Sequence, residues 1–528
     1  MFVRTKTTQG RTYLQVVESY WQDGRPRQRV IATLGRLDKL AQRGQIEGIL
    51  RSLSRFSDKV RVTEDYRAGN LEAKRVQKIG PDLICARLWR ELGIGEVLNK
   101  LLSERKFEFP LERAVYLSTL SRLFFPGSDR RTMARARDYH ISGEGELSLH
   151  HLYRAMSFLG DNRERIEDEL FFRNRDLFSS LSLVFFDTTT LYFEGRGGES
   201  LGRRGYSKDR RPDENQMVLG MVLDDRGRPI ACPAWPGNTT DASTLLPVAE
   251  SLRSRFGISD ICIVADRGMV GKKNTQELEG LGFSYILGVK MRLEKKAMAE
   301  ILSRPGRFRE VADNLKVKEV RYQGKRYIVC LNPQEAERDR LSREAMVADL
   351  QRKIAESPSS LIGNTGYRRY LKAGQRPEID WEKVREEERY DGRFVLLTNT
   401  ELSPEEVAEK YKELWRVERI FREAKDTLRT RPIYHQSDSY ILGHVFCSFL
   451  ALLLMHELKA RTGGEFEWDE MRQDLEALYE IEVEQDGKTW LLRSPLQGCA
   501  GKIFKACGVA VPPSAREADP NATALFRG

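Results

Sequence analysis

The stretch LVFFD at residues 183–187 decides the fold prediction, because a run of apolar residues ends there in an acidic one. An uninterrupted apolar run of this length is typical of a strand that is buried on both faces. The stretch ICIVAD at residues 261–266 repeats the pattern. We therefore predict two buried strands that end at Asp187 and Asp266. An aspartate after a strand often only forms a turn. Taken alone, each of these residues is therefore as consistent with a structural role as with a catalytic one.

A third acidic residue, Glu418, lies in a segment with a helical pattern. Residues 411–425 contain neither Gly nor Pro, and Pro404 marks the expected start of the helix. At about 100° per residue, one apolar stripe should face the core: Leu414, Val417, Phe421, Ala424 and Leu428. The adjacent edge should hold four functional side chains: Tyr411, Glu418, Arg422 and Lys425. The simpler alternative is a solvated face with an i,i+4 pair of Glu418 and Arg422.

Two strand-end aspartates and one helical glutamate can hold two divalent metal ions about 3.5 to 4 Å apart, as in-line attack on a phosphodiester requires. We therefore expect Asp187, Asp266 and Glu418 to be metal ligands and catalytic residues, with two Mg²⁺ per site and Mn²⁺ able to replace them. The tyrosine hydroxyl and the cations beside Glu418 would then contact DNA phosphates.

Four motifs, in this order, resemble the DDE transposases of bacterial insertion sequences: residues 186–190, 236–241, 265–269 and 411–425. The resemblance is closest to the group with a Tyr-Arg-Glu-Lys signature and a β-rich insertion in the catalytic core. It implies an α/β fold with an RNase H-like mixed sheet, and the three acidic residues at the metal site. Tyr411 and Lys425 match the outer members of the signature.

The arginine of the signature does not match. Its expected place, three residues after Tyr411, is Leu414, and the nearest arginine is Arg416. In the family this arginine helps to hold the phosphate beside the cleavage site. We infer that Arg422, one turn beyond Glu418, replaces it, because ideal helix geometry turns Arg416 about 160° away from Glu418.

The chain is long enough for about three domains. A mainly helical N-terminal region, preceded by a β-hairpin around Asp23-Gly24, is expected before the catalytic core. We predict a hairpin and linker at 1–60, followed by a helical region that binds DNA ends at 61–180. The first part of the core spans 181–290, the insertion 291–391, and the second part of the core, with Glu418, 392–460. The C-terminal region, 461–528, could serve dimerisation and ends in a disordered tail. Core strands are predicted at 183–186, 191–193, 216–223, 229–233, 261–265 and 285–290, and Asp241 should cap a helix at 241–256.

Two further features predict contacts with DNA. A basic loop beside the first core strand contains glycines that would let the backbone approach phosphates: Arg203, Arg204, Lys208, Arg210 and Arg211. A solvated charge run is an equally good interpretation of this loop. Trp381 is the only tryptophan of the insertion and a candidate for base stacking, against a role in packing.

Composition favours a polyanionic partner inside the cell. The 528 residues include 88 Lys and Arg against 78 Asp and Glu, for a net charge of +10. The seven cysteines are scattered, which argues against disulfides or a zinc site. No signal peptide is expected at the N-terminus, and the apolar residues 445–455 are too few to span a bilayer. We expect a cytoplasmic protein that is nucleoid-associated when bound to DNA, without a membrane partner.

The expected function is cut-and-paste DNA transposition. The protein would bind the terminal inverted repeats of its insertion sequence, nick the double-stranded DNA, and let the freed 3′-hydroxyl attack the opposite strand or target DNA. Synapsis of two ends implies a homodimer. The alternatives are a stand-alone nuclease with the same fold, and a domesticated DNA-binding protein, which would be expected to lose one of the acidic residues. A haloacid-dehalogenase-type phosphotransferase would need an aspartate at the position of Thr189.

Overall fold

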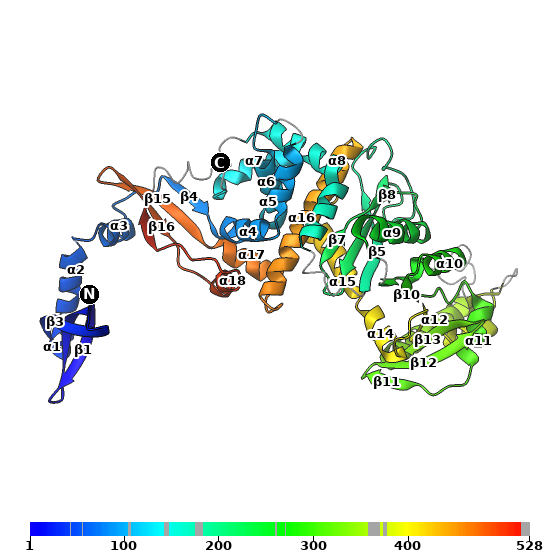
Figure 1. Ribbon diagram of the computed structural model, residues 1–528. Coiled ribbons are helices and arrows are strands. Elements are labelled where there is room, and N and C mark those ends of the chain that lie inside the picture. Colours follow the sequence, from blue (N-terminus) through cyan, green and yellow to red (C-terminus); the bar gives the residue numbers. More distant parts are fainter. Residues whose placement is uncertain are drawn as a thin grey trace. The chain divides into compact units, whose positions relative to one another are not determined.

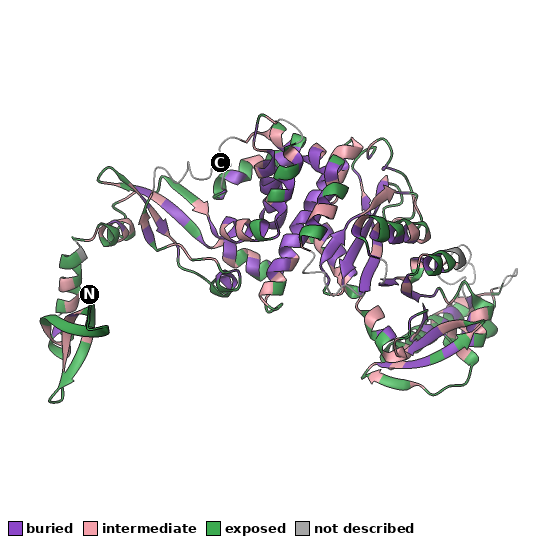
Figure 2. Ribbon diagram, viewed as in Figure 1, coloured by how far each residue is buried: buried purple, intermediate pink, exposed green. Residues whose placement is uncertain are grey.

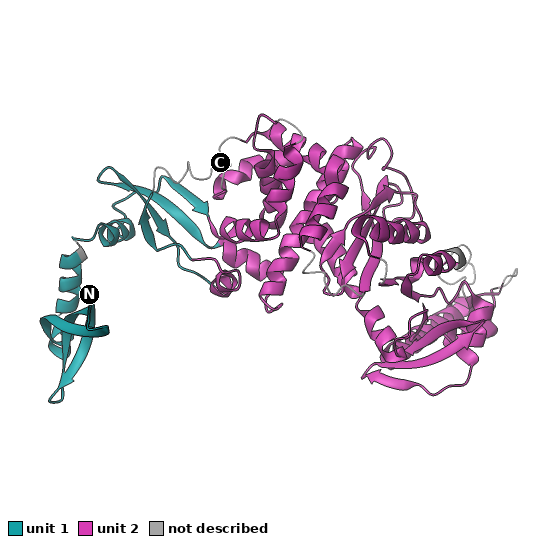
Figure 3. Ribbon diagram, in the orientation of Figure 1, with its two compact units in different colours: residues 1–78, 477–497, 511–528 teal, residues 79–476, 498–510 magenta. Residues whose placement is uncertain are grey.

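The computed structural model describes residues 1–42, 44–54, 56–103, 107–141, 147–174, 183–258, 261–269, 271–356, 370–372 and 377–518. The chain forms two compact units, and each unit joins segments that are distant in the sequence (Figure 3). Unit 1 comprises residues 1–78, 477–497 and 511–528, and unit 2 comprises residues 79–476 and 498–510. The finer division into six segments remains a prediction.

Unit 1 begins with a three-stranded antiparallel sheet of order β1-β2-β3: Phe2–Thr8, Arg11–Gln22 and Arg25–Arg36. Asp23 and Gly24 join β2 to β3 with positive φ angles of 51° and 71°, as a tight hairpin turn requires. The predicted hairpin is confirmed, whereas β1 was not predicted. Much of this sheet is exposed to solvent (Figure 2). Three helices follow: α1 Leu37–Gln42, α2 Gln45–Ser54 and α3 Asp58–Arg67.

A second sheet of unit 1 joins the N-terminal and C-terminal segments. Its order is β17-β16-β15-β4: Ala515–Glu517, Lys488–Arg493, Tyr479–Gln485 and Arg75–Lys78. Val62 of α3 packs against one face with the apolar side chains of the sheet. No strand was predicted in residues 461–528, although Asp486-Gly487 has the same turn signal as Asp23-Gly24. The residues after 518, where a disordered tail was predicted, lie outside the described residues.

Unit 2 contains a helical layer that includes α4 Gly80–Glu91, α5 Ile94–Leu102, α6 Leu111–Phe124, α7 Asp129–Arg135, α8 Leu149–Arg173, α16 Asp438–Arg461, α17 Trp468–Glu476 and α18 Ala500–Ala506 (Figure 1). Helices α4 to α8 lie in the region predicted to be mainly helical, and this prediction is confirmed for its described residues. Helices α8 and α16 approach closely at two glycines. A Cβ on Gly160 would lie 1.9 Å from the Ser439 carbonyl oxygen, and one on Gly443 would lie 1.8 Å from that of Met156.

Helix α16 is the one described helix that is long and apolar enough to cross a membrane by length and composition. Of its most apolar window, 89% is buried inside the protein. It packs against α6 and α8. The apolar residues 445–455 therefore lie within a longer helix that is mostly buried in the protein.

The catalytic core of the family would correspond to a mixed sheet in unit 2. The strands follow the order β11-β12-β13-β14-β10-β9-β5-β6-β7, and β8 pairs with β6. Strand β5 pairs parallel with β9, and β9 parallel with β10, whereas β6 and β14 pair antiparallel with their neighbours. The part β7-β6-β5-β9-β10 is the RNase H-like arrangement. The bounds are β5 Leu183–Tyr192, β6 Gln216–Asp224, β7 Pro229–Ala231, β8 Ala234–Pro236, β9 Cys262–Ala265 and β10 Ser284–Gly288.

Helix α9, Asp241–Phe256, covers one face of this sheet, and its buried residues Leu245, Val248 and Leu252 belong to the same core cluster as Val184 and Phe186. The predicted helix at 241–256 is confirmed. Its N-cap is Thr240, however, and Asp241 is the first helical residue. Helix α10, Lys272–Gly280, follows β9.

The insertion between β10 and β14, Arg393–Thr398, extends the same sheet. Its strands β12 and β13 continue the antiparallel pairing beyond β14, because their apolar residues face the shared core cluster. The other elements are β11 Arg309–Ala312, β12 Leu315–Tyr322, β13 Lys325–Leu331, α11 Lys295–Ser303, α12 Pro333–Glu356 and α13 Trp381–Glu388. The predicted insertion and its strands are confirmed, although its described helices cover more residues than its strands.

The single helix predicted over residues 411–425 is wrong. The segment consists of α14 Pro404–Lys412, α15 Trp415–Arg422 and the π-helical turn η7 Glu423–Thr427. Between α14 and α15 the amides of Leu414, Arg416 and Val417 donate to carbonyls three residues earlier, which tightens the backbone out of α-helical geometry. Tyr411, Glu418 and Lys425 therefore belong to three different elements, and a spacing of seven residues does not by itself align them.

Candidate active site

Asp187 lies in the middle of a strand, and the prediction that the strand ends there is wrong. Strand β5 continues to Tyr192, because the β-branched Thr188, Thr189 and Thr190 are buried and pair with β6. What ends before Asp187 is the parallel pairing with β9, whose last pair is Phe186 with Ala265. Asp187 therefore lies at the point where β5 leaves its parallel neighbour.

Asp266 follows β9 directly, as predicted. Because Phe186 pairs with Ala265, Asp187 and Asp266 occupy the next positions on two neighbouring strands. Side chains alternate between the faces of a sheet, so both aspartates lie on the face opposite Phe186 and α9. Helix α15, which bears Glu418, packs against β5 and β6, and its buried residues Val417 and Phe421 are not part of the α9 cluster. The aspartates and α15 thus share one side of the sheet.

Tyr411 holds Asp266 directly. Its hydroxyl donates a hydrogen bond of 3.0 Å to Asp266 Oδ1, and its ring stacks on Phe394. Gly288 at the end of β10 makes room for this contact, since a Cβ there would lie 2.3 Å from the tyrosine oxygen. Burial and the nearby Asp266 carboxylate raise the pKa of Tyr411 above its ordinary value. Tyr411 is therefore a neutral donor that orients a carboxylate.

The acidic side chains also affect one another. Burial raises the pKa of Asp187 to about 7, and the charges of Asp266 and Asp241 act in the same direction. Lys208 and the backbone amide of Thr188 oppose this shift. A carboxyl group with such a pKa is poised to exchange its proton for a cation near neutral pH.

Glu418 differs from the two aspartates because it is exposed. Its carboxylate forms no ion pair or hydrogen bond within the described parts of the chain. The predicted apolar stripe of its helix is confirmed, since all five of its members are buried: Leu414, Val417, Phe421, Ala424 and Leu428. The burial of Leu414 also gives a physical reason why no arginine stands at this position.

A lysine ammonium lies among oxygen atoms beside the aspartates. The Lys208 ammonium donates hydrogen bonds of 2.7 Å to the carbonyl oxygen and 3.0 Å to the hydroxyl of Thr188. It also lies 3.3 Å from Asp241 Oδ2 and 3.9 Å from Asp187 Oδ1. The Lys208 ammonium is therefore directed toward the acidic residues, and its contact with a DNA phosphate stays a prediction. Sequence reasoning had considered Asp241 only as a helix cap.

Lys425 is also paired within the protein. Its ammonium lies 2.8 Å from Asp209, whose carboxylate also binds Arg431 at 2.6 Å. Burial lowers the pKa of Lys425, and the Asp209 charge opposes this effect. The side chains of Lys425 and Asp209 are 10% and 6% exposed, so this pair fixes the basic loop to the segment after Glu418. A phosphate contact of Lys425 stays a prediction.

The remaining predicted DNA contacts fall into two groups. Arg204, Arg210 and Arg422 are exposed and form no ion pair within the described ranges. Arg203 and Arg211 are engaged locally: Arg203 donates to the carbonyls of Gly202 and Glu199, and Arg211 binds Glu214.

Trp381 and Arg416 lie on other elements. Trp381 is the first residue of α13 and is 49% exposed. Arg416 donates to the Asp225 carbonyl and lies 3.4 Å from Glu413, so it is turned away from Glu418 as predicted.

Oxygen ligands of this kind fit a hard divalent cation. Asp187, Asp241 and Asp266 supply carboxylates, and the Lys208 ammonium lies within 4 Å of two of them, Asp187 and Asp241. Among described residues, the one group of three ligand-type side chains with all ligand atoms within 4.8 Å is Glu470, Asp474 and Cys499, on α17 and before α18. The predicted metal ligands are therefore spaced more widely, which a site for two ions allows.

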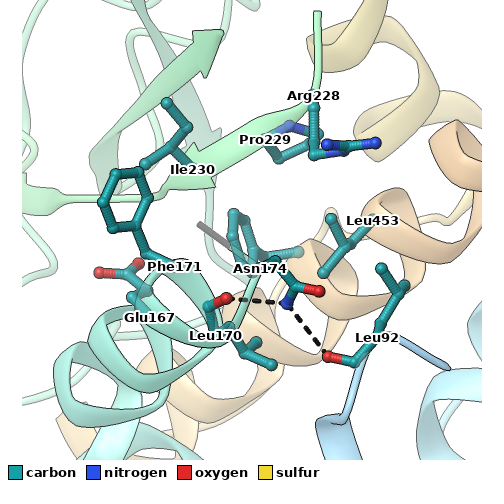
Figure 4. Close-up of a pocket in the computed structure, with 10 residues that line it drawn as sticks. Leu92, Glu167, Leu170, Phe171, Asn174, Arg228, Pro229, Ile230 and Leu453 are labelled. Atoms are coloured by element: carbon teal, nitrogen blue, oxygen red, sulfur yellow. Dashed lines mark hydrogen bonds between the residues drawn. The ribbon is translucent and has the colours of Figure 1, made fainter. Parts of the chain in front are cut away.

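A separate pocket in unit 2 lies between the helical layer and β7 (Figure 4). Apolar side chains such as Phe171, Ile230 and Leu453 line it, and Asn174 bridges the carbonyls of Leu92 and Leu170. None of the predicted site residues lines this pocket. We interpret it as a packing space between layers.

Strand order and acidic residues together define a class of protein, the RNase H-like polynucleotidyl transferases. Residues 179–454 match the family model described as "Transposase DDE domain". This match covers more than half of the chain, and the chain belongs to the DDE transposase family. Residues 2–65 match the N-terminal domain of IS1634 family transposases.

Two solved transposase structures are similar to this chain at a low level. One is a cryo-EM structure of the piggyBac transposase synaptic complex with hairpin DNA, which is 11% identical in sequence. The match covers 75% of this chain and 79% of the piggyBac chain, with a TM-score of 0.35. The Mos1 transposase paired-end complex with the left transposon end is 12% identical, covers 34% and 60% respectively, and has a TM-score of 0.15. No curated protein sequence matches this chain.

Proposed function

We propose that this DDE transposase binds the terminal inverted repeats of its own insertion sequence, cleaves the DNA at their ends, and joins the freed ends to target DNA. The observation that supports this most directly is the placement of Asp187 on β5 beside Asp266, which directly follows β9, with the helix of Glu418 packed against β5 and β6. In this proposal the three carboxylates bind the catalytic metal.

Mg²⁺ bound at such a site would activate the attacking water or hydroxyl and stabilise the leaving oxygen. The chain's own groups position the carboxylates. Tyr411 orients Asp266, and the amide of Thr188 donates 2.7 Å to Asp187 Oδ1. The exposed Arg204, Arg210 and Arg422 are available for DNA phosphates, and Trp381 for an unstacked base. Synapsis of two ends would require a homodimer, acting in the cytoplasm on nucleoid DNA.

The test is single-turnover cleavage of labelled DNA taken from the flanks of the reading frame. Asp187→Asn, Asp266→Asn and Glu418→Gln should each slow cleavage more than about 100-fold, because each removes a charged metal ligand, while DNA binding stays within a few fold. Glu413→Gln is the matched control for Glu418, since it changes a nearby glutamate that pairs with Arg416. If any of the three variants keeps more than about a tenth of the wild-type rate, the metal-site assignment is wrong.

Strand transfer separates this proposal from its alternatives. A transposase should join a pre-cleaved end with a free 3′-hydroxyl to plasmid DNA, whereas a stand-alone nuclease would cut but not join. A domesticated DNA-binding protein would do neither, although it would still retain the labelled end in a binding assay.

A further inference from the structure

We propose that Asp241 is a fourth carboxylate of the metal site and that Lys208 is an internal cation that competes with the metal ion for it. This inference rests on the proposed function, because it concerns the same site. The family resemblance placed Asp241 in a motif but gave it no role, whereas the charge and the glycines of its loop predicted that Lys208 contacts DNA.

The Asp241 carboxylate contacts the residue after Asp187 and lies close to the turn that follows Asp266. Its Oδ1 accepts a hydrogen bond of 2.6 Å from the hydroxyl of Thr188, the residue after Asp187. On its other side, a Cβ on Gly268 would lie 3.0 Å from Asp241 Oδ2, and Gly268 is two residues after Asp266. Helix α9 also packs against the turn that contains Gly268. The carboxylate of Asp241 is thus held close to the segments that bear both aspartates.

Asp241 lies at a helix N-terminus and is accessible to solvent. It is the first residue of a 16-residue helix, where the exposed backbone amides and the helix dipole stabilise negative charge. Its side chain is 28% exposed, so that water and ions can reach it. A helix cap alone does not explain the arrangement, because the Asp241 side chain accepts from Thr188 and caps no amide of its own helix.

Lys208 is positioned from both sides. Its backbone amide donates to the hydroxyl of Thr190 at 3.0 Å, and the next residue, Asp209, is bound to Lys425 and Arg431. These contacts aim the ammonium at Thr188, Asp187 and Asp241. An ammonium held against two carboxylates neutralises part of their charge, and a metal ion that binds them must displace it.

Calorimetric titration of the full chain with Mg²⁺, without DNA, tests the proposal. Asp241→Asn should weaken Mg²⁺ binding about 10- to 100-fold, the range seen when a group that supports a metal site is removed. Lys208→Met should strengthen it about fivefold, since a partly exposed ion pair is removed. Lys208→Arg keeps the charge and should bind Mg²⁺ like the wild type. Arg210→Met, which removes the same charge from an exposed position of the same loop, should change the affinity less than about twofold.

Melting curves in EDTA show whether each variant is folded, and Asn at position 241 can still accept from Thr188. An unchanged Mg²⁺ affinity in Asp241→Asn, with a clear loss in Asp187→Asn, would overturn the role of Asp241 and leave the proposed function intact. An equal gain in Lys208→Met and Arg210→Met would show a general charge effect and overturn the role of Lys208. If Asp187→Asn also binds Mg²⁺ normally, the metal site itself is misplaced, and both proposals fail.

Discussion

The strand-borne acidic residues and the helix-borne one are held in different ways. Asp187 lies on β5 and Asp266 directly follows the neighbouring β9, and each has fixed partners: Thr188 and Lys208 beside Asp187, and Tyr411 on Asp266. Glu418 is exposed on a short helix between a tightened turn and a π-helical turn. The difference shows that a sheet fixes a carboxylate through its register, whereas a helix fixes it only through the packing of its opposite face.

The largest expected difference between the two regions is in the pH dependence of stability. The pKa of Asp187 is raised in the folded protein to about 7 from an unfolded value of 3.8. Between these values the folded state binds the proton more tightly, so without metal the free energy of unfolding should fall as pH rises from about 4 to 7, by at most about 4 kcal/mol.

Chemical denaturation in EDTA at several pH values measures this change in the free energy of unfolding. Asp187→Asn should remove most of the decline, whereas Glu418→Gln should leave it in place, because Glu418 is exposed and unpaired in the described structure. A decline that persists in Asp187→Asn would mean that the buried charge has another source.

Substitutions of Arg422 and Arg416 test which arginine near Glu418 contacts a DNA phosphate. Arg422→Ala should slow end cleavage about 10- to 100-fold, the effect of losing a charge-assisted phosphate contact of roughly 1.5 to 3 kcal/mol. Arg416→Ala should do much less, because this side chain is bound to Asp225 and Glu413. Single-turnover rates, with melting curves to exclude unfolding, compare the two. A larger loss at Arg416 would reverse the assignment.

Tyr411→Phe tests whether the hydrogen bond that holds Asp266 contributes to cleavage. The variant keeps the ring on Phe394 but loses the hydrogen bond to Asp266. We expect cleavage to slow about tenfold, since one hydrogen bond to a charged group is lost. Tyr434→Phe, a change at an exposed tyrosine, is the control and should have little effect. Equal rates for wild type and Tyr411→Phe would show that Asp266 needs no such donor.

The smallest effect is expected in the basic loop, where exposed arginines contrast with the paired Lys208. Replacing Arg204 and Arg210 together by Met should weaken the salt dependence of DNA binding. The slope of the logarithm of the DNA association constant against the logarithm of the salt concentration should become smaller in magnitude by about 1.8, at roughly 0.9 per phosphate contact. Lys208→Met, measured in EDTA, should change the slope less, because its ammonium is occupied by the acidic residues. An unchanged slope in the double variant would show that both arginines are solvated and do not contact DNA phosphates.

Several failures of prediction have a physical cause in neighbours that are distant in the sequence. Asp187 looked like a strand end, but pairing with β6 keeps the following threonines in the strand. Residues 411–425 have no helix breaker, yet the backbone tightens at Leu414, whose side chain is buried. The C-terminal strands could have been found, because Asp486-Gly487 lies between two β-rich runs.

The sequence alone determined many, though not all, of the elements of this transposase. Apolar runs predicted the buried strands of the core, and periodic apolar residues predicted the stripe of α15, because both depend on local pattern. Only the tertiary structure decided which charged groups meet. Lys208, Asp241 and Asp187 come from a loop, a helix start and a strand, and Lys425 meets Asp209 across more than 200 residues. Such pairings depend on how strands align and loops return, and no spacing along the chain records them.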